Sequence, residues 1–178
     1  MRVIAGSARR TVLAAPTGQS TRPTADRIKE NLFNIISPCI PGARFLDLFC
    51  GSGAIGIEAL SRGTSEAVFV DASSEAVTVT KANLARARLT GRVIHMCGIA
   101  AISQLEHEGS SFDIIFLDPP YGMGLLGQTL DALGRSRILS PEGILIAECH
   151  VDEPEPPAEP FILQDIREYG STRMLFYK

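Results

Sequence analysis

Short apolar segments alternate with helix-like segments along most of the chain, and this alternation constrains the fold more than any other feature. The segments ARFLDLF (43–49), EAVFVD (66–71) and FDIIFLD (112–118) are typical of buried strands, and stretches with helical periodicity lie between them. Repeated strand–helix–strand units require a parallel sheet with right-handed crossovers. The sequence therefore predicts an α/β, Rossmann-like, doubly wound and mostly parallel sheet.

The two ends of the chain extend this pattern. Residues 1–13 predict a short hairpin, and RPTADRIKENLFNII (22–36) predicts a helix that the following prolines close. Residues 161–178 predict two antiparallel strands that form a hairpin at the sheet edge. We expect a single domain over 1–178, in which residues 1–37 form a basic hairpin and helix extension.

Positive charge is concentrated near the N-terminus. The first 30 residues hold six Arg or Lys and two acids, a net charge of +4, although the whole chain has a net charge of −3. A basic segment on an acidic body is typical of a nucleic-acid contact, and a solvated charged tail is the alternative. The helix within this segment is expected to begin with Thr24 as N-cap and to place four apolar side chains on one face: Ile28, Leu32, Ile35 and Ile36.

Three other classes of protein are disfavoured. No apolar run approaches the roughly 20 residues that a membrane-spanning helix needs. The first ten residues, MRVIAGSARR, lack the apolar block of a signal peptide, so a cytoplasmic protein is expected. The four cysteines are far apart in the sequence, which predicts small buried side chains rather than a metal site or disulfide bonds: Cys39, Cys50, Cys97 and Cys149.

A glycine-rich turn, DLFCGSGAIG (47–56), follows the first strand. Ligands of open α/β sheets bind beyond the carboxyl ends of the strands, where Gly51 and Gly53 would let the backbone turn tightly towards a ligand. Asp71 ends the next strand, where a carboxylate can accept both hydroxyls of a ribose, and a helix cap is its alternative role. The pattern predicts an adenosyl ligand and fits both NAD and S-adenosylmethionine (SAM).

Asp47 favours one of these two ligands. It lies directly before the glycine turn, where the middle of the ligand is expected. A dinucleotide has a pyrophosphate at that place, which a carboxylate would repel, whereas SAM has a sulfonium cation and a zwitterionic methionine there. The sequence therefore favours SAM over NAD.

A second distinctive turn, Asp118-Pro119-Pro120-Tyr121, follows the strand at 112–118 and is expected at the same sheet edge. The prolines stiffen the loop and have no N–H group, so its rim offers acceptors only, the Asp118 carboxylate and the Pro119 carbonyl. Tyr121 adds a flat ring. This set complements the exocyclic amine of a base that has swung out of its stack, held for attack on a methyl group.

These motifs together resemble a known family. Asp118-Pro119-Pro120-Tyr121 resembles the [Asn/Asp/Ser]-Pro-Pro-[Tyr/Phe/Trp] motif of SAM-dependent amino-methyltransferases, and the turn at 47–53 resembles their SAM loop. MRVIAG, RPTADRIKENLFN, LDLFCGSGAIGIEALSRG and FLDPPY also occur in the order and spacing of the RsmD-type methyltransferases. The resemblance covers essentially the whole chain. It implies the SAM-dependent methyltransferase fold and methylation of the N2 amine of a guanine in small-subunit (16S) ribosomal RNA.

The resemblance also implies roles for individual residues. SAM would be bound by Asp47, Phe49, Gly51, Ser52, Gly53 and Asp71, and the target base by Asp118, Pro119, Pro120 and Tyr121. The RNA would be bound by Arg22, Thr24, Arg27 and Lys29, joined by Arg9 and Arg10 if the N-terminal hairpin is part of the RNA surface. Cys97-Gly98 stands where the family usually has Asp or Asn, so the backbone at Gly98 and apolar packing would hold the adenine.

The family acts on RNA that is already assembled with ribosomal proteins. The expected partner is therefore 16S rRNA in a partly or fully assembled small subunit, bound by a cytoplasmic monomer without a metal. Two alternatives stay open: a DNA adenine-N6 or other amino-methyltransferase, and a non-catalytic adenosyl-binding module. The first would need a sizeable target-recognition segment, and the intact Asp118–Tyr121 motif speaks against the second.

Overall fold

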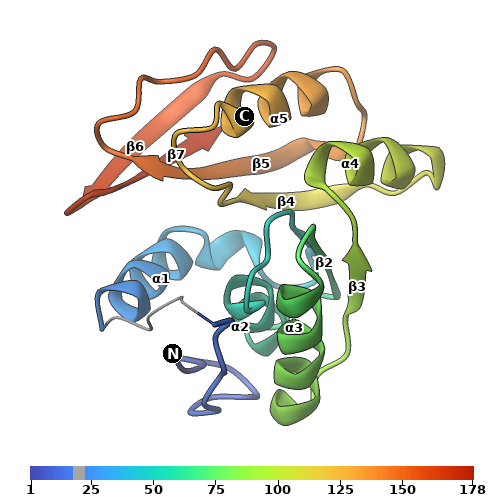
Figure 1. Cartoon of the computed structure of the whole chain (residues 1–178), viewed down its shortest axis with the longest axis vertical. Coiled ribbons are helices and arrows are strands. Elements are labelled where there is room, and N and C mark those ends of the chain that lie inside the picture. Colours follow the sequence, from blue (N-terminus) through green and yellow to red (C-terminus); the bar gives the residue numbers. More distant parts are fainter. Residues whose placement is uncertain (18–22) are drawn as a thin grey trace.

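A seven-stranded sheet runs through the computed structural model, which describes residues 1–17 and 23–178 (Figure 1). The strand order is β3-β2-β1-β4-β5-β7-β6, with neighbours parallel from β3 to β5 and antiparallel from β5 to β6. The strands are β1 Arg44–Asp47, β2 Glu66–Asp71, β3 Arg92–His95, β4 Phe112–Leu117, β5 Leu139–His150, β6 Leu163–Tyr169 and β7 Thr172–Tyr177. The predicted doubly wound sheet with an antiparallel edge hairpin is confirmed.

The helices cover both faces of this sheet. One face carries α1 (Pro23–Ile35), α2 (Ala54–Ser61) and α3 (Ser74–Ala87), and the other carries α4 (Gly98–His107) and α5 (Leu125–Gly134) (Figure 1). A short 3-10 helix, η1 (Ser37–Cys39), follows α1. Neighbouring strand residues face opposite sides, so that Phe45 packs in the α1–α3 layer and Leu46 in the α4–α5 layer. Both faces of the central strands are therefore buried.

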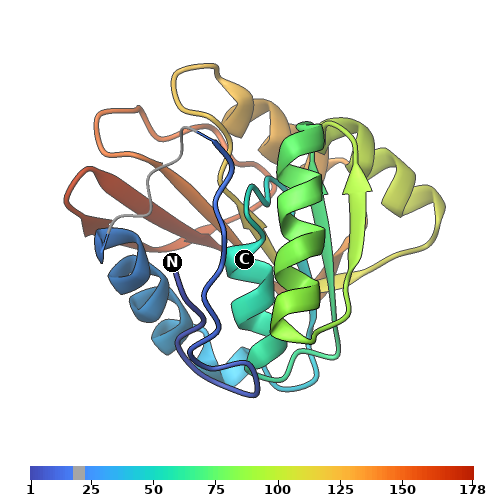
Figure 2. The ribbon, with the colours of Figure 1, turned by 60° about the horizontal axis from the view of Figure 1, so that its bottom comes forward.

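The N-terminal arm, residues 1–17, doubles back on itself and lies along α2 and α3 (Figure 2). Arg2 and Val12 form a single antiparallel bridge, and the amides of Val3 and Leu13 donate to the carbonyls of Thr11 and Met1, so the predicted hairpin is present without regular strands. Val3, Ala8 and Leu13 are buried in the core. The backbone of the arm is thus packed against the body, which does not agree with the alternative of a solvated tail.

Three details differ from the sequence-based predictions. The helix α1 begins at Pro23, so Thr24 lies within its first turn rather than at its N-cap. On α1, Ile28 and Leu32 are buried as expected, but Ile35 is 39% exposed and Phe33 takes its place in the core. Among the cysteines, Cys50 and Cys149 are buried and all four are free thiols, but the remaining two are exposed rather than buried: Cys39 and Cys97.

The residues that the structure describes include no helix long and apolar enough to cross a membrane. Within 1–17 and 23–178 there is also no group of three His, Cys, Asp or Glu side chains that could hold a metal ion.

Candidate active site

Three carboxylates gather at the carboxyl ends of the central strands. Asp47 ends β1, Asp71 ends β2, and Asp118 directly follows β4. Because β1 pairs with both β2 and β4, the three strands end side by side. The strand order also reverses between β1 and β4, and this is where open α/β sheets bind ligands.

The glycine turn between β1 and α2 has the backbone that the sequence predicts. Gly51 and Gly53 have φ angles of 52° and 75°, in the region that favours glycine. A Cβ atom on Gly53 would lie 2.8 Å from Thr80, and one on Gly56 would lie 2.3 Å from the ring of Phe69. Gly53 is the N-cap residue of α2. The Gly56 amide in the first turn donates to Asp47, whereas the earlier amides of that turn have no helical partner and can meet a ligand.

Asp71 holds this turn in place. Its Oδ2 accepts a 2.8 Å hydrogen bond from the amide of Gly51, and its Oδ1 accepts one of 2.8 Å from the amide of Ser73. Ser73 itself caps α3 by accepting from the amide of Ala76 at 3.3 Å. Asp71 is therefore not the helix cap. Each carboxylate oxygen has a further lone pair, so Asp71 can still accept both hydroxyls of a ribose.

Asp47 is buried between the turn and the sheet. It is 1% exposed, and its Oδ2 accepts a 3.0 Å hydrogen bond from the amide of Gly56. Burial raises the pKa of Asp47 to about 7; the hydrogen bond from Gly56 opposes this shift and the charge of Asp71 adds to it. A cation bound nearby would favour the ionised carboxylate. The site therefore suits a positively charged group.

Asp118 has two acidic neighbours, Glu148 and Asp47. Asp118 is exposed, yet desolvation by the neighbouring protein, with Glu148 and Asp47 nearby, raises the pKa of Asp118 well above its ordinary range. Glu148, on β5, also has its pKa raised by burial. It accepts a 3.1 Å hydrogen bond from the hydroxyl of Tyr121. Sequence reasoning missed Glu148; the available signal was an acid within the otherwise apolar strand GILIAEC.

The loop after Asp118 presents an aromatic ring to solvent. Pro119 is buried and Pro120 exposed, and Tyr121 is 43% exposed. The Tyr121 ring meets the ring of His150 edge-on, with centroids 5.9 Å apart. Burial of the hydroxyl and the charge of Glu148 raise the pKa of Tyr121, so the phenol stays protonated. The ring is thus held at its hydroxyl end while much of the side chain stays accessible.

The other residues expected at the ligand lie around the turn. Gly98 begins α4 and is buried against Phe49, whose ring would lie 3.0 Å from a Cβ atom on this glycine. Cys97 precedes it without a side-chain cap, so amides of α4 are available beside Phe49. Ser52 is buried, and its hydroxyl contacts the sulfur of Met1 at 3.9 Å.

The basic residues expected at RNA divide into two groups. Arg9, Arg10 and Arg27 are exposed. Lys29 is 3% exposed, lies 3.2 Å from Oε2 of Glu58, and donates a 2.6 Å hydrogen bond to the carbonyl of Arg2.

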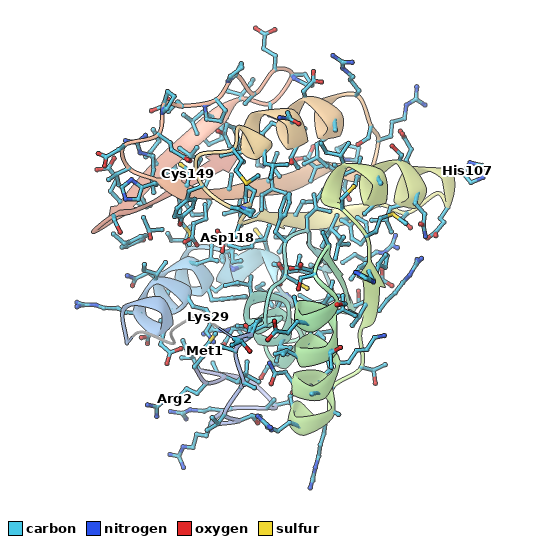
Figure 3. All side chains as sticks on the ribbon, viewed as in Figure 1. Met1, Arg2, Lys29, His107, Asp118 and Cys149 are labelled. Carbon is cyan, nitrogen blue, oxygen red and sulfur yellow. The ribbon has the colours of Figure 1, made fainter. Side chains whose placement is uncertain are left out.

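Figure 3 shows Lys29 close to Met1, whereas Arg2 points away from the body. The burial of Lys29 and its pairing with Glu58 speak against the expectation that it binds RNA, because its charge already has a partner inside the protein. Arg22 lies outside the described residues, and so does the side chain of Thr24.

The chain is similar to known proteins over its whole length. The family model described as "Conserved hypothetical protein 95" matches residues 1–178. The protein YlbH of Bacillus subtilis strain 168 is 40% identical over 182 residues, which cover 100% of this chain and 98% of that protein. Ribosomal RNA small subunit methyltransferase D of Escherichia coli strain K12 is 36% identical over 153 residues, which cover 85% and 76%. The solved structure of yhhF from Escherichia coli has a TM-score of 0.86 and 32% identity, over 99% of this chain and 96% of that one.

Proposed function

Because the chain belongs to the family described as conserved hypothetical protein 95, the RsmD-type methyltransferases, we propose that it methylates the N2 amine of a guanine in 16S rRNA. The coarser activity, SAM-dependent methylation of ribosomal RNA, is that of the family. The observation that carries the finer proposal is the acceptor-lined, aromatic rim at Asp118–Tyr121, which lies across the strand-order reversal from the glycine turn.

The residues at the sheet edge fit SAM. Asp71 would accept the ribose hydroxyls, and Phe49 and the α4 amides at Gly98 would hold the adenine. The glycine turn would hold the methionine end, and the ionised form of Asp47 would favour the sulfonium. SAM supplies an electrophilic methyl group, which the attacking amine nitrogen receives as the carbon–sulfur bond breaks.

The rim positions the amine for this attack. The Asp118 carboxylate and the Pro119 carbonyl would accept its two N–H hydrogens, which favours a pyramidal nitrogen with a free lone pair. The ring of Tyr121 would stack on the flipped base. Because the pKa of Asp118 is raised, its carboxylate is also a suitable acceptor for the proton that the amine releases after methyl transfer.

The exposed arginines Arg9, Arg10 and Arg27 would contact phosphates, together with Arg22 and Thr24. We further propose that residues 1–178 form one domain, with 1–37 as its RNA-binding extension, and that it acts as a cytoplasmic monomer on a partly or fully assembled small subunit. In support, the arm and α1 pack on the face that also carries α2 and α3, so exposed arginines and the glycine turn share one layer.

The test is transfer of a tritiated methyl group to small subunits, naked rRNA and DNA from a strain that lacks the protein, followed by nucleoside analysis. We expect N2-methylguanosine in the rRNA of small subunits, lost with Asp118→Asn and kept with Asp131→Asn, an exposed acid on α5. Methyladenine in DNA would overturn the proposal.

A further inference from the structure

One buried amide joins the N-terminal arm to the glycine turn. The side chain of Asn83, on α3, is fully buried. Its Nδ2 donates to the carbonyl of Ala14 at 2.9 Å and to the carbonyl of Ser52 at 2.8 Å. Its Oδ1 accepts from the amide of Ala14 at 2.9 Å. The arm and the turn therefore bond to the same side-chain group.

This arrangement is not explained by the helix that carries Asn83. A buried amide is costly unless its hydrogen bonds are made, and an apolar side chain would serve α3 better at an interior position. Asn83 makes three of its four hydrogen bonds, all of them to backbone atoms distant in sequence. Its polar atoms are thus directed at the arm and the turn rather than at its own helix.

Two neighbouring buried side chains each bond to only one of these two segments, the arm or the glycine turn. Thr80, one turn earlier on α3, donates to the carbonyl of Gly51 at 3.0 Å and so holds the glycine turn only. Glu58 accepts from the amides of Ile4 and Ala5 at 2.8 and 3.0 Å and pairs with Lys29 and Arg62, so it holds the arm but does not bond to the glycine turn. Of these three buried polar side chains, Asn83 is the one that bonds to both.

We propose that Asn83 is a positioning residue that couples RNA binding at the N-terminal arm to SAM binding at the glycine turn. The RNA part of this inference rests on the proposed function, because Arg9 and Arg10 are the phosphate contacts of the arm. A shift of the arm changes the position of Ala14, and through one amide group it changes the position of the Ser52 carbonyl. By linkage, each ligand then strengthens the binding of the other by the same factor.

The first measurement needs no RNA. Hydrogen exchange of the Val3 and Leu13 amides, which bond within the arm to Thr11 and Met1, is followed with and without S-adenosylhomocysteine. In the unmodified protein, we expect the ligand to slow their exchange about fivefold or more. Asn83→Leu, similar in size, should remove this slowing of exchange. Thr80→Val should weaken ligand binding, but the bound ligand should still slow the exchange of the Val3 and Leu13 amides.

The second measurement is calorimetry of S-adenosylhomocysteine with and without small subunits. We expect small subunits to tighten its binding about fivefold or more, and Asn83→Leu to remove the tightening. Asn83→Ala removes the same three hydrogen bonds without placing a bulkier or charged group against the two carbonyl oxygens, so it should also lack the tightening. It serves as the second variant if Asn83→Leu does not fold, with thermal unfolding as the check.

The inference is overturned if the ligand leaves Val3 and Leu13 exchange unchanged in the unmodified protein, or if the effect survives in both Asn83 variants. Its failure differs from that of the proposed function. If the ligand slows exchange in an Asn83-dependent way but small subunits are not methylated, the role of Asn83 stands and the RNA substrate is wrong.

Discussion

Replacing Lys29 by methionine should destabilise the protein without weakening its electrostatic attraction to RNA. The ammonium group of Lys29 is buried, 3.2 Å from a carboxylate oxygen of Glu58. Removing one partner of a buried ion pair typically costs about 3–5 kcal/mol. Glu58 would keep two backbone amides and the guanidinium of Arg62, which is 2.8 Å away. We therefore expect a loss of about 3 kcal/mol in the free energy of unfolding, at the lower end of that range.

The desolvation of Lys29 also favours a loss of free energy of unfolding near the lower end of this range. Burial lowers the pKa of Lys29, and Glu58 only opposes this shift. Part of the attraction between the two charges is thus offset by the cost of removing them from water. Methionine keeps the apolar stem of lysine, so the loss of packing should be small.

Arg27→Met is the matched control, because Arg27 lies on the same helix but is exposed. Urea unfolding should place this variant within about 0.5 kcal/mol of the unmodified protein. Its binding to small subunits should show a salt dependence flatter by about 0.7–0.9 log units per log unit of salt, the value for one phosphate contact. Lys29→Met should leave that slope unchanged.

Two results would refute this reasoning. An unchanged urea midpoint in Lys29→Met would show that the buried ion pair does not stabilise the fold. A salt slope flattened as much as in Arg27→Met would show that Lys29 reaches phosphate despite its burial.

Three further predictions concern the carboxylates at the sheet edge. Asp118→Asn should slow single-turnover methyl transfer about a hundredfold or more, with unchanged affinity for S-adenosylhomocysteine by calorimetry, because its contacts belong to the amine. Asp71→Ala should weaken SAM binding by roughly 1.5–3 kcal/mol, and NAD should not bind measurably. The pKa of Asp47 is raised from 3.8 to about 7, so the folded state binds this proton more tightly than the unfolded state. Its protonated form therefore contributes stability that is lost as the pH rises from about 4 to about 7, and urea unfolding of Asp47→Asn should lack this component.

The strands and their acidic ends could be predicted because they depend on local patterns. The segment predicted at 66–71 is β2, and Asp71 ends it as expected. Asp47 and Asp118 were placed at the same edge by the rule that parallel strands share one direction. The glycine turn was equally accessible, because Gly53 has the positive φ that its sequence pattern indicates.

Contacts between distant segments could not be predicted in this way. Strand β5 lies between β4 and the antiparallel strand β7, and Glu148 on β5 pairs with Met174 of β7. This sheet pairing places Glu148 beside Tyr121, which follows β4. Lys29 is buried because Glu58 approaches from a different helix, and a lysine on a polar-looking helix is otherwise expected in solvent. In both cases, a charged side chain has a partner that no local pattern indicates.

The uneven charge of the chain has a physical explanation in this arrangement. Asp47, Asp118 and Glu148 lie at the carboxyl ends of the central strands, and in their ionised forms they repel phosphate but suit a sulfonium and the N–H groups of an amine. A polyanion therefore needs its attractive contacts elsewhere, and exposed Arg9 and Arg10 on the packed arm can provide them. We infer that the acidic site selects the reacting groups while the basic arm supplies the affinity for RNA. A chain with a net charge of −3 can then act on a nucleic acid.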